Sequence, residues 1–273
     1  MATSSSTLRI GVIGFGQWGP NHVRNFRMID DCDVVRACDL SSARLALARK
    51  QFRDLETTTG PAAITMAPDV DAVIVATPVH THVALVRQAL EQGKDGLCEK
   101  PLAATVSECR ELCTLAAAPV EVSATGGFFL QEKIEDIGFL TLHYPKGVIC
   151  HVHTSWLNPR KVRHLTIVGD HKMAVWDDMN NLEPIRYYDK GVTADHYSSF
   201  GEFQMILRDG AITIPKVRMF EPLLRQDEDF VECVRARRTP AASCEFGLGV
   251  VHVIEAAVES MRHRGRVTPV ARS

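Results

Sequence analysis

The sequence lacks the features that would direct the protein to a membrane, to nucleic acid or out of the cell. Its 31 basic and 33 acidic residues give a formal net charge of −2, so no basic field favours nucleic acid or an anionic membrane surface. No apolar run approaches the roughly 20 residues that span a bilayer. The Ser-rich residues 1–7 have neither the basic nor the apolar region of a signal peptide. We therefore expect a cytoplasmic protein without nucleic-acid or membrane partners.

The eight cysteines include no C-x-x-C pair and follow no regular spacing. In a chain without a secretion signal they are most simply interpreted as reduced, mostly buried thiols. A zinc site from Cys109, Cys113 and a distant histidine is the alternative, but the pattern favours no metal. The chain has no repeats or low-complexity linker. Its composition, 45% hydrophobic and 23% charged, fits one large or two ordinary globular domains.

The most informative motif is a glycine-rich turn that follows a short apolar run at residues 9–13. Gly14, Gly16 and Gly19 form G-x-G-x-x-G, and Asp39 follows 20 residues after the last glycine. This spacing is typical of a dinucleotide site: the glycines allow a tight turn, close approach of the pyrophosphate and helix–strand packing, while the acid accepts from the ribose hydroxyls. A purely structural glycine turn is the alternative interpretation.

Asp39 and Arg44 bear on the choice between the two nicotinamide cofactors. A carboxylate at this position repels a 2′-phosphate, so NAD is favoured over NADP. Arg44 lies five residues later, where a basic side chain can reach such a phosphate. Its alternative interpretation, which we favour, is a solvated helix residue.

Strand and helix signals alternate through the first 118 residues and predict a doubly wound parallel sheet, the Rossmann form of the α/β class. The apolar run at 71–76 fits a parallel strand that is covered on both faces. Strands are expected at 9–13, 33–38, 55–58, 71–76 and 96–98, and helices at 19–28, 42–51, 82–92 and 107–117.

After residue 119 the pattern changes to that of an α+β domain with an open, mainly antiparallel sheet. Strands are expected at 139–143, 148–156, 165–168 and 173–176, and a hairpin at 203–214 turns at Asp209 and Gly210. Helices follow at 222–237 and 247–263, and Gly265 is the expected stop. The predicted domains are a dinucleotide-binding domain at 1–119, lacking its last strand, and a substrate and oligomerisation domain at 120–273.

Three motifs resemble those of the Gfo/Idh/MocA oxidoreductase family. They are Gly14-Phe15-Gly16-Gln17-Trp18-Gly19, the segment from Ala76-Thr77-Pro78 to His82, and Cys98-Glu99-Lys100-Pro101. The last motif is the most specific. Residues 155–163 and 221–223 look similar to members that oxidise nucleotide-activated sugars, above all the UDP-N-acetyl-glucosaminuronate 3-dehydrogenases.

The resemblance implies an NAD(P)-dependent dehydrogenase that moves hydride from a secondary alcohol of a sugar to the cofactor. Lys100 would be catalytic, orienting the reacting hydroxyl and easing loss of its proton, since negative charge develops on that oxygen. Cofactor contacts would come from Phe15, Gln17 and Trp18 in the glycine turn, and from Thr77, Pro78, His82, Glu99 and Pro101. A solvated loop lysine is the alternative for Lys100.

One departure from the family pattern follows residue 118. The helix expected at 107–117 runs almost directly into 120–124, and several dozen residues that carry the family's acid/base aspartate and histidine are absent. The alternative function is therefore a catalytically impaired or dead dinucleotide-binding relative. His151, His153 and His164 are candidates for a replacement base, although ordinary polar surface residues are the favoured interpretation.

The C-terminal half supplies the candidates for substrate contacts and for assembly. His153, Trp156, Arg160 and Lys161 are candidate substrate-binding residues, because the basic pair suits an anionic sugar or diphosphate. A solvated turn is the alternative for the basic pair. The resemblance also implies a homo-oligomer that packs through the C-terminal sheet.

Overall fold

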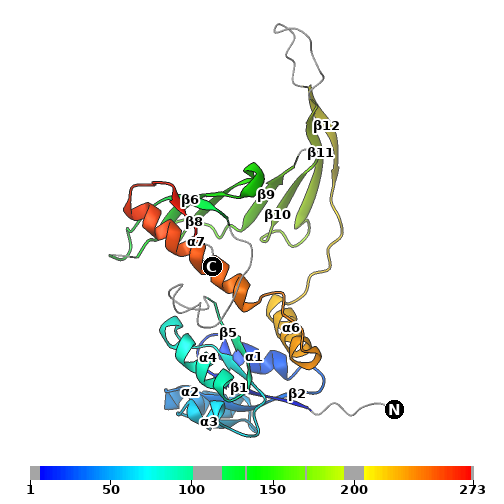
Figure 1. Ribbon diagram of the computed structural model, residues 1–273. Helices are drawn as coiled ribbons and strands as arrows, with labels where there is room; N and C mark the ends of the chain where they lie inside the picture. Colours follow the sequence, from blue (N-terminus) through cyan, green and yellow to red (C-terminus); the bar gives the residue numbers. More distant parts are fainter. Residues whose placement is uncertain (1–6, 101–118, 133, 170, 194–205, 272–273) are drawn as a thin grey trace. The chain divides into compact units, whose positions relative to one another are not determined.

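The structure is a computed structural model that describes residues 7–100, 119–132, 134–169, 171–193 and 206–271 (Figure 1). It divides into two compact units, one made of Met1–Thr154 with Glu221–Ser273 and the other of Ser155–Phe220. Pro101 and the helix expected at 107–117 lie outside the described residues. The domain boundary predicted at 119 stays a prediction.

The first unit contains the predicted parallel sheet, so the Rossmann assignment is confirmed. Five strands lie in the order β3-β2-β1-β4-β5, and each neighbouring pair is parallel. Their bounds are β1 Leu8–Ile13, β2 Cys32–Cys38, β3 Glu56–Thr58, β4 Ala72–Val75 and β5 Asp95–Cys98. β1 pairs with β2 on one side and β4 on the other, which is the switch point where this fold binds ligands at the carboxyl ends of strands.

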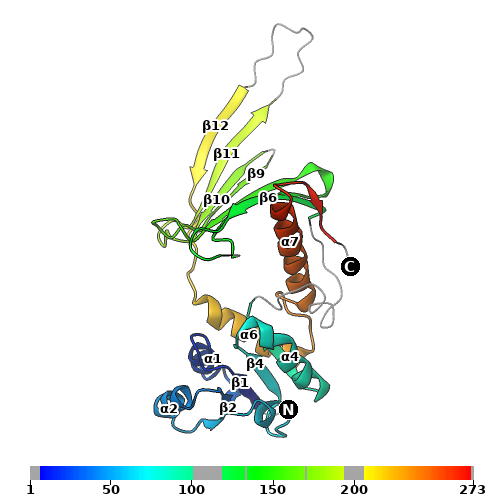
Figure 2. The ribbon, with the colours of Figure 1, turned by 90° about the vertical axis from the view of Figure 1, so that its left-hand side faces the viewer.

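Helices cover both faces of this sheet. Apolar side chains of α1 (Gly19–Phe26) and α6 (Pro222–Ala236) share one core with β1 and β2, and α3 (Ala62–Thr65) and α4 (His82–Glu91) build the core with β4. α2 (Ser42–Gln51) completes the set of helices before residue 100 that accompany the sheet. Helix α6 therefore returns from the C-terminal half of the sequence to pack beside α1 (Figure 2).

A second sheet of the first unit has the order β13-β6-β7-β8 and packs against α7 (Cys244–Arg262). Its strands are β6 Glu121–Gly127, β7 Ile137–His143, β8 Ile149–Ser155 and β13 Thr268–Pro269, with a short η2 turn at Pro145–Gly147. The Ser260 hydroxyl accepts from the Ala124 amide at 2.8 Å. Gly265 has a φ of 85°, as expected for the residue that stops α7. β6 and β13 were not expected from the sequence.

The second unit is an antiparallel sheet with the order β12-β11-β10-β9. Its strands are β9 His164–Val168, β10 Met173–Asp177, β11 Ile185–Thr193 and β12 Ile206–Thr213. The β9–β10 hairpin confirms the prediction around residue 169, since Val168 pairs with Met173. The open antiparallel character of the C-terminal half is therefore also confirmed.

The hairpin predicted to turn at Asp209 and Gly210 is wrong. Both residues lie inside the single strand β12, which pairs with β11. The register of that pair shifts between Tyr188 and Lys190, and a side chain on Gly210 would collide with the backbone oxygen of Asp189. The glycine is thus required by a close approach of two strands at a bulge, not by a turn.

Cysteine chemistry differs from the expectation at one position. Among the described residues Cys32, Cys38, Cys98, Cys150 and Cys233 are free thiols, whereas Cys244 is disulfide-bonded. Burial raises the pKa of Cys32 to about 12 and that of Cys38 to about 11, which keeps both as neutral thiols. Cys109 and Cys113, named for a zinc site, lie outside the described residues. Within those residues no helix has the length and apolar character needed to cross a membrane.

Candidate functional site

The glycine turn joins β1 to α1 and assigns a distinct task to each glycine. Gly14 has a φ of 100°, and a side chain there would collide with the Ala76 backbone oxygen. A side chain on Gly19 would collide with the Gly14 oxygen, so this glycine permits the close packing of helix and turn. At Gly16 the nearest atom to an added Cβ is Arg44 Nη1 at 3.8 Å. The fold itself does not require Gly16, and its missing side chain leaves open space beside the turn.

Asp39 follows β2 directly and is only 7% exposed. Its Oδ2 accepts the Phe15 amide at 2.8 Å and its Oδ1 accepts the Ser41 amide at 2.8 Å. Arg44 Nη1 lies 3.5 Å from Oδ2. The carboxylate thus ties the glycine turn to the start of α2, and it holds Arg44 as a partner.

A cavity of about 710 Å³ opens beside these residues. It brings together Gly14, Gly16, Asp39, Arg44, Thr77 and Pro78 from the predicted cofactor set. A smaller hollow of about 290 Å³ is lined by Phe15, Gly16, Gln17 and Arg44, among others. Most of the Phe15 side chain is buried in the core, where its ring meets that of Phe52 edge-on at 6.2 Å.

His82 does not line that cavity but contacts Thr77, which does. The residue is 1% exposed, and its Nε2 is 2.8 Å from the Thr77 backbone oxygen. The Thr77 hydroxyl is 2.7 Å from that of Thr81. His82 therefore supports the loop after β4 that forms a wall of the cavity.

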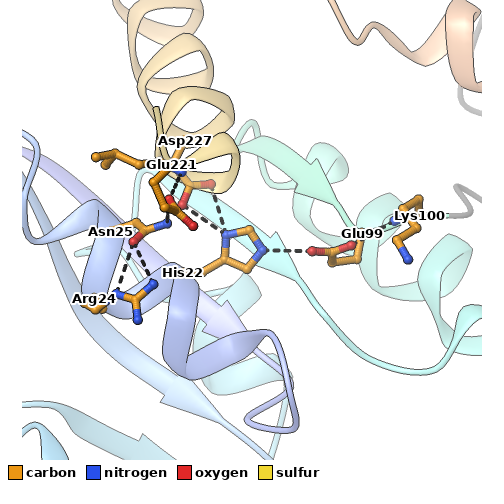
Figure 3. A network of polar contacts seen from close by, with 8 residues as sticks. His22, Arg24, Asn25, Glu99, Lys100, Glu221 and Asp227 are labelled. Carbon is orange, nitrogen blue, oxygen red and sulfur yellow. Dashed lines mark hydrogen bonds and ion pairs between the residues drawn. The ribbon is translucent and has the colours of Figure 1, made fainter. Parts of the chain in front are cut away.

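Lys100 reaches the glycine turn from the end of β5. Its Nζ lies 6.0 Å from the centroid of the Trp18 ring, in a cation–π arrangement. The preceding Glu99 uses both carboxylate oxygens: Oε2 accepts the Lys100 amide at 3.2 Å, and Oε1 lies 3.1 Å from His22 Nε2 (Figure 3). The end of β5 is therefore held against α1 through a side chain of each.

His22 and Asp227 are the residues of this site that sequence reasoning missed. His22 lies on α1 and Asp227 on α6, both side chains are 0% exposed, and Nδ1 is 3.0 Å from Asp227 Oδ1. His22 occurs inside a segment that the sequence marks only as a helix. Asp227 lies 205 residues further along, and no spacing rule links the two.

The charges in this network shift one another. Burial, the largest single effect, lowers the pKa of His22, but hydrogen bonds and attraction from Asp227 and Glu99 together outweigh it and raise the pKa to about 9. The pKa of Glu99 is lowered, first by its hydrogen bond with His22. The pKa of Asp227 is raised by burial, which the bond to His22 opposes. At neutral pH the network therefore contains an imidazolium.

The candidate substrate residues lie in two places. His153, on β8, is exposed and stacks on the Phe139 ring with centroids 4.6 Å apart. Trp156, Arg160 and Lys161 follow β8 in the second unit and are exposed, Trp156 by 84%. Their roles stay predictions. His151 and His164, the other candidates for a base, are also exposed.

Comparison with known proteins matches two models of one family to residues 8–175. The family model described as "Oxidoreductase family, NAD-binding Rossmann fold" matches residues 8–123, and the "GFO/IDH/MocA C-terminal domain" matches residues 112–175. Inositol 2-dehydrogenase 2 of Paenarthrobacter aurescens is 40% identical over 124 residues, 45% of this chain and 36% of that protein. Inositol 2-dehydrogenase of Ralstonia nicotianae is 38% identical over 205 residues, 71% of this chain and 56% of that protein.

A solved structure shows the same fold over nearly the whole chain. UDP-N-acetylglucosamine 3-dehydrogenase GnnA from Acidithiobacillus ferrooxidans superposes with a TM-score of 0.76 at 20% identity, covering 93% of this chain and 98% of that one. The curated relatives are longer: the matched part of this chain spans about a third to a half of their length. The matched models, the shared fold and the glycine turn agree, and the chain belongs to the Gfo/Idh/MocA family of oxidoreductases.

Proposed function

We propose that this protein is an NAD-dependent oxidoreductase that removes hydride from a secondary alcohol of a sugar or nucleotide sugar. The observation that carries the proposal is the meeting of three features at the carboxyl ends of the parallel strands. These are the glycine turn after β1, the cavity bordered by Asp39, and Lys100 after β5, whose ammonium lies over the Trp18 ring. Ligands of this fold bind at that edge.

The described residues fit a dinucleotide. Asp39 at the cavity suits the ribose hydroxyls, and the clear space at Gly16 beside the first turn of α1 suits the pyrophosphate. The nicotinamide end would then extend toward Lys100. When bound, the nicotinamide supplies the acceptor for the hydride. The chain's part is to hold that ring and the substrate carbon together and to keep the reacting hydroxyl in place.

Lys100 is proposed as the catalytic group. As hydride leaves carbon, negative charge develops on the attached oxygen, and an ammonium hydrogen-bonded to that oxygen stabilises it and eases the loss of its proton. Trp18 contacts the Lys100 side chain from the glycine turn. Lys100 is exposed, and this contact with the glycine turn supports a location near the cofactor.

NAD is proposed as the cofactor in preference to NADP. Asp39 accepts two backbone amides and is nearly buried, so its charge is fixed where a 2′-phosphate would lie. Arg44 pairs with this carboxylate. We expect Asp39→Ser to weaken the binding of NADH and to raise the affinity for NADPH relative to NADH by at least about tenfold, because placing like charges together costs several kcal/mol. An unchanged ratio of the two dissociation constants would contradict this assignment.

The substrate class rests on the relatives, two of which are named as inositol dehydrogenases and one as a UDP-N-acetylglucosamine dehydrogenase. A ring carbon bearing a secondary hydroxyl is common to these compounds. The segment that carries the family's acid/base aspartate and histidine has no counterpart in this sequence. Because general acid–base help contributes about a hundred- to ten-thousand-fold in rate, we expect slow turnover.

The test is NADH formation from NAD with a panel of cyclic polyols, sugars and nucleotide sugars. At least one substrate should give turnover, and Lys100→Ala should abolish it without lowering the melting temperature of the protein. Turnover that survives Lys100→Ala would contradict the role of this lysine. NADH binding with no turnover on any substrate would favour the alternative, a dinucleotide-binding relative that has lost its activity.

We also propose that copies of the chain assemble through the sheet of the second unit. The register places Leu165 beside Trp176 and Ile167 beside Ala174, and Tyr187 beside Ala174. Leu165, Ile167, Trp176 and Tyr187 therefore share one face, and each is 41–58% exposed. We call this set the apolar sheet face. An exposed apolar patch of this kind is typical of a protein–protein contact.

A further inference from the structure

We infer that His22 is a positioning residue for Lys100: as an imidazolium held between Asp227 and Glu99, it fixes the turn after β5 that presents the lysine. This inference deepens the proposed function and rests on it for the role of Lys100. It assigns no contact between His22 and substrate or cofactor. His22 acts through Glu99.

The protonation state follows first from geometry. Nδ1 of His22 faces the Asp227 carboxylate at 3.0 Å, and Nε2 faces the Glu99 carboxylate at 3.1 Å. An ionised carboxylate only accepts hydrogen bonds, and a neutral imidazole carries a single N–H. Both bonds are donated by the ring only when it is the imidazolium. The raised pKa of His22, about 9, agrees with this arrangement.

The connection to Lys100 passes through Glu99. One carboxylate oxygen accepts from His22 and the other accepts the backbone amide of Lys100 at 3.2 Å. Rotation of the Glu99 carboxylate would break both bonds, so the ring of His22 restricts the direction in which the chain leaves β5. The Lys100 ammonium then lies over the ring of Trp18, on the glycine turn that precedes α1.

The far side of the ring is anchored by helix α6. The Asp227 side chain is fully buried. Asn25 lies on α1 three residues after His22, and its amide donates to Glu221 at 3.3 Å. Glu221 caps α6 by accepting the Leu224 amide at 2.5 Å. His22 and Asn25 thus contact α6 from one face of α1. The charged groups of this network are Glu221 and Asp227 on the side of α6 and Glu99 and Lys100 on the side of β5.

Two amide substitutions separate the bonds of the ring. In His22→Gln the amide nitrogen takes the place of Nε2 and still donates to Glu99, whereas in His22→Asn it takes the place of Nδ1 and donates only toward Asp227. We expect NADH binding by calorimetry to weaken about tenfold in His22→Asn, the effect of one charged hydrogen bond. His22→Gln should stay within about threefold of the native protein.

If His22 served only to fill space, the loss of NADH affinity in His22→Asn and His22→Gln would follow the loss of melting temperature in each variant. Equal NADH affinities in the native protein and His22→Asn would overturn the inference. Equal losses in the two variants would do the same. Asp227→Asn preserves shape and removes a charge, so it serves if both histidine variants fail to fold. NADH binding should weaken at the pH where His22 loses its charge, and Asp227→Asn should shift this loss to lower pH. An unchanged pH profile of NADH binding would contradict the inference.

A titration of the native protein separates this inference from the proposed function. Nitrogen-15 NMR of histidine-labelled protein, with His22→Gln to assign the signal, follows the ring without any cofactor. His22 should keep both ring protons through neutral pH and lose one near pH 9. Titration of His22 near the ordinary pKa of histidine would overturn the inference that an imidazolium is held between Asp227 and Glu99. Failure of the native protein to bind NADH or NADPH would instead sink the proposed function.

Discussion

Strands β4 and β9 both contain large apolar residues but have opposite surroundings. All four residues of β4 are buried, whereas all five residues of β9 are exposed. The difference arises because α3 and α4 cover one face of the parallel sheet and α1 and α6 the other, while Leu165 and Ile167 of β9 remain on the apolar sheet face. The first sheet is covered by helices of its own chain, and the second presents the apolar sheet face through which we propose that copies assemble.

The largest expected effect compares one isoleucine from each sheet. Ile74 is 0% exposed and Ile167 is 58% exposed. We expect Ile74→Ala to lower the free energy of unfolding by about 2–5 kcal/mol, and Ile167→Ala to change it by less than about 0.5 kcal/mol in dilute protein. Urea unfolding measures both. Equal losses at low protein concentration would mean that β9 is covered within one chain.

The imidazolium of His22, held between Asp227 and Glu99, makes the stability of the protein depend on pH. Since the pKa of folded His22 is raised from 6.5 to about 9, its contribution to stability is fully present below about pH 6.5 and is lost as pH rises through about 9. The loss is on the order of 3 kcal/mol, from roughly 1.4 kcal/mol per pKa unit. His22→Gln lacks this titration and serves as the control. Parallel curves for the two proteins in denaturant unfolding would contradict the imidazolium.

The bulge between β11 and β12 predicts a loss of stability when a side chain is added at Gly210. Gly210→Ala places a Cβ against the Asp189 backbone, and we expect a loss of about 1–3 kcal/mol, as for other overpacked sites. Gly249→Ala is the matched control, because a Cβ there meets no atom within 4 Å, and on helix α7 it should stabilise by up to about 1 kcal/mol. Thermal unfolding distinguishes the two. A neutral Gly210→Ala would mean that the strands separate at the bulge.

The apolar sheet face gives the smallest effect on a single chain and a clear effect on assembly. Trp176→Lys should leave monomer stability within about 0.5 kcal/mol while reducing the mass of the particle in light scattering. Thr166→Lys is the control, since the register places Thr166 on the opposite face of β9 from Leu165. A native protein that is monomeric at every concentration, or equal effects of the two lysines, would contradict assembly through this face.

Local signals predicted the parallel sheet well because each element there carries its own pattern. The glycine turn, the apolar run of β4 and the residues of α2 are all read within a few positions. The same signals named Gly14, Gly16, Asp39 and Thr77 as one site, and all four line a single cavity in the structure. Lys100 was named from its motif, and its location over Trp18 came from the structure.

Long-range contacts account for what the sequence did not reveal. His22 has no distinctive neighbour in the sequence, and its partner Asp227 is in a helix that belongs to the C-terminal half. The Asp209-Gly210 pair satisfies the local rule for a turn, but the approach of Asp189 uses the same glycine inside a strand. In both cases a residue far along the chain determines the structure, and a local pattern carries no information about it.

Calorimetric titration with NADH and, separately, NADPH tests the central claim most directly. The native protein should bind NADH with micromolar affinity and NADPH at least about tenfold more weakly, because Asp39 opposes a 2′-phosphate. Gly16→Ala, which the fold accommodates, should weaken NADH binding, and Gly249→Ala should leave it unchanged. Binding of neither cofactor by a protein that melts cooperatively would contradict the account.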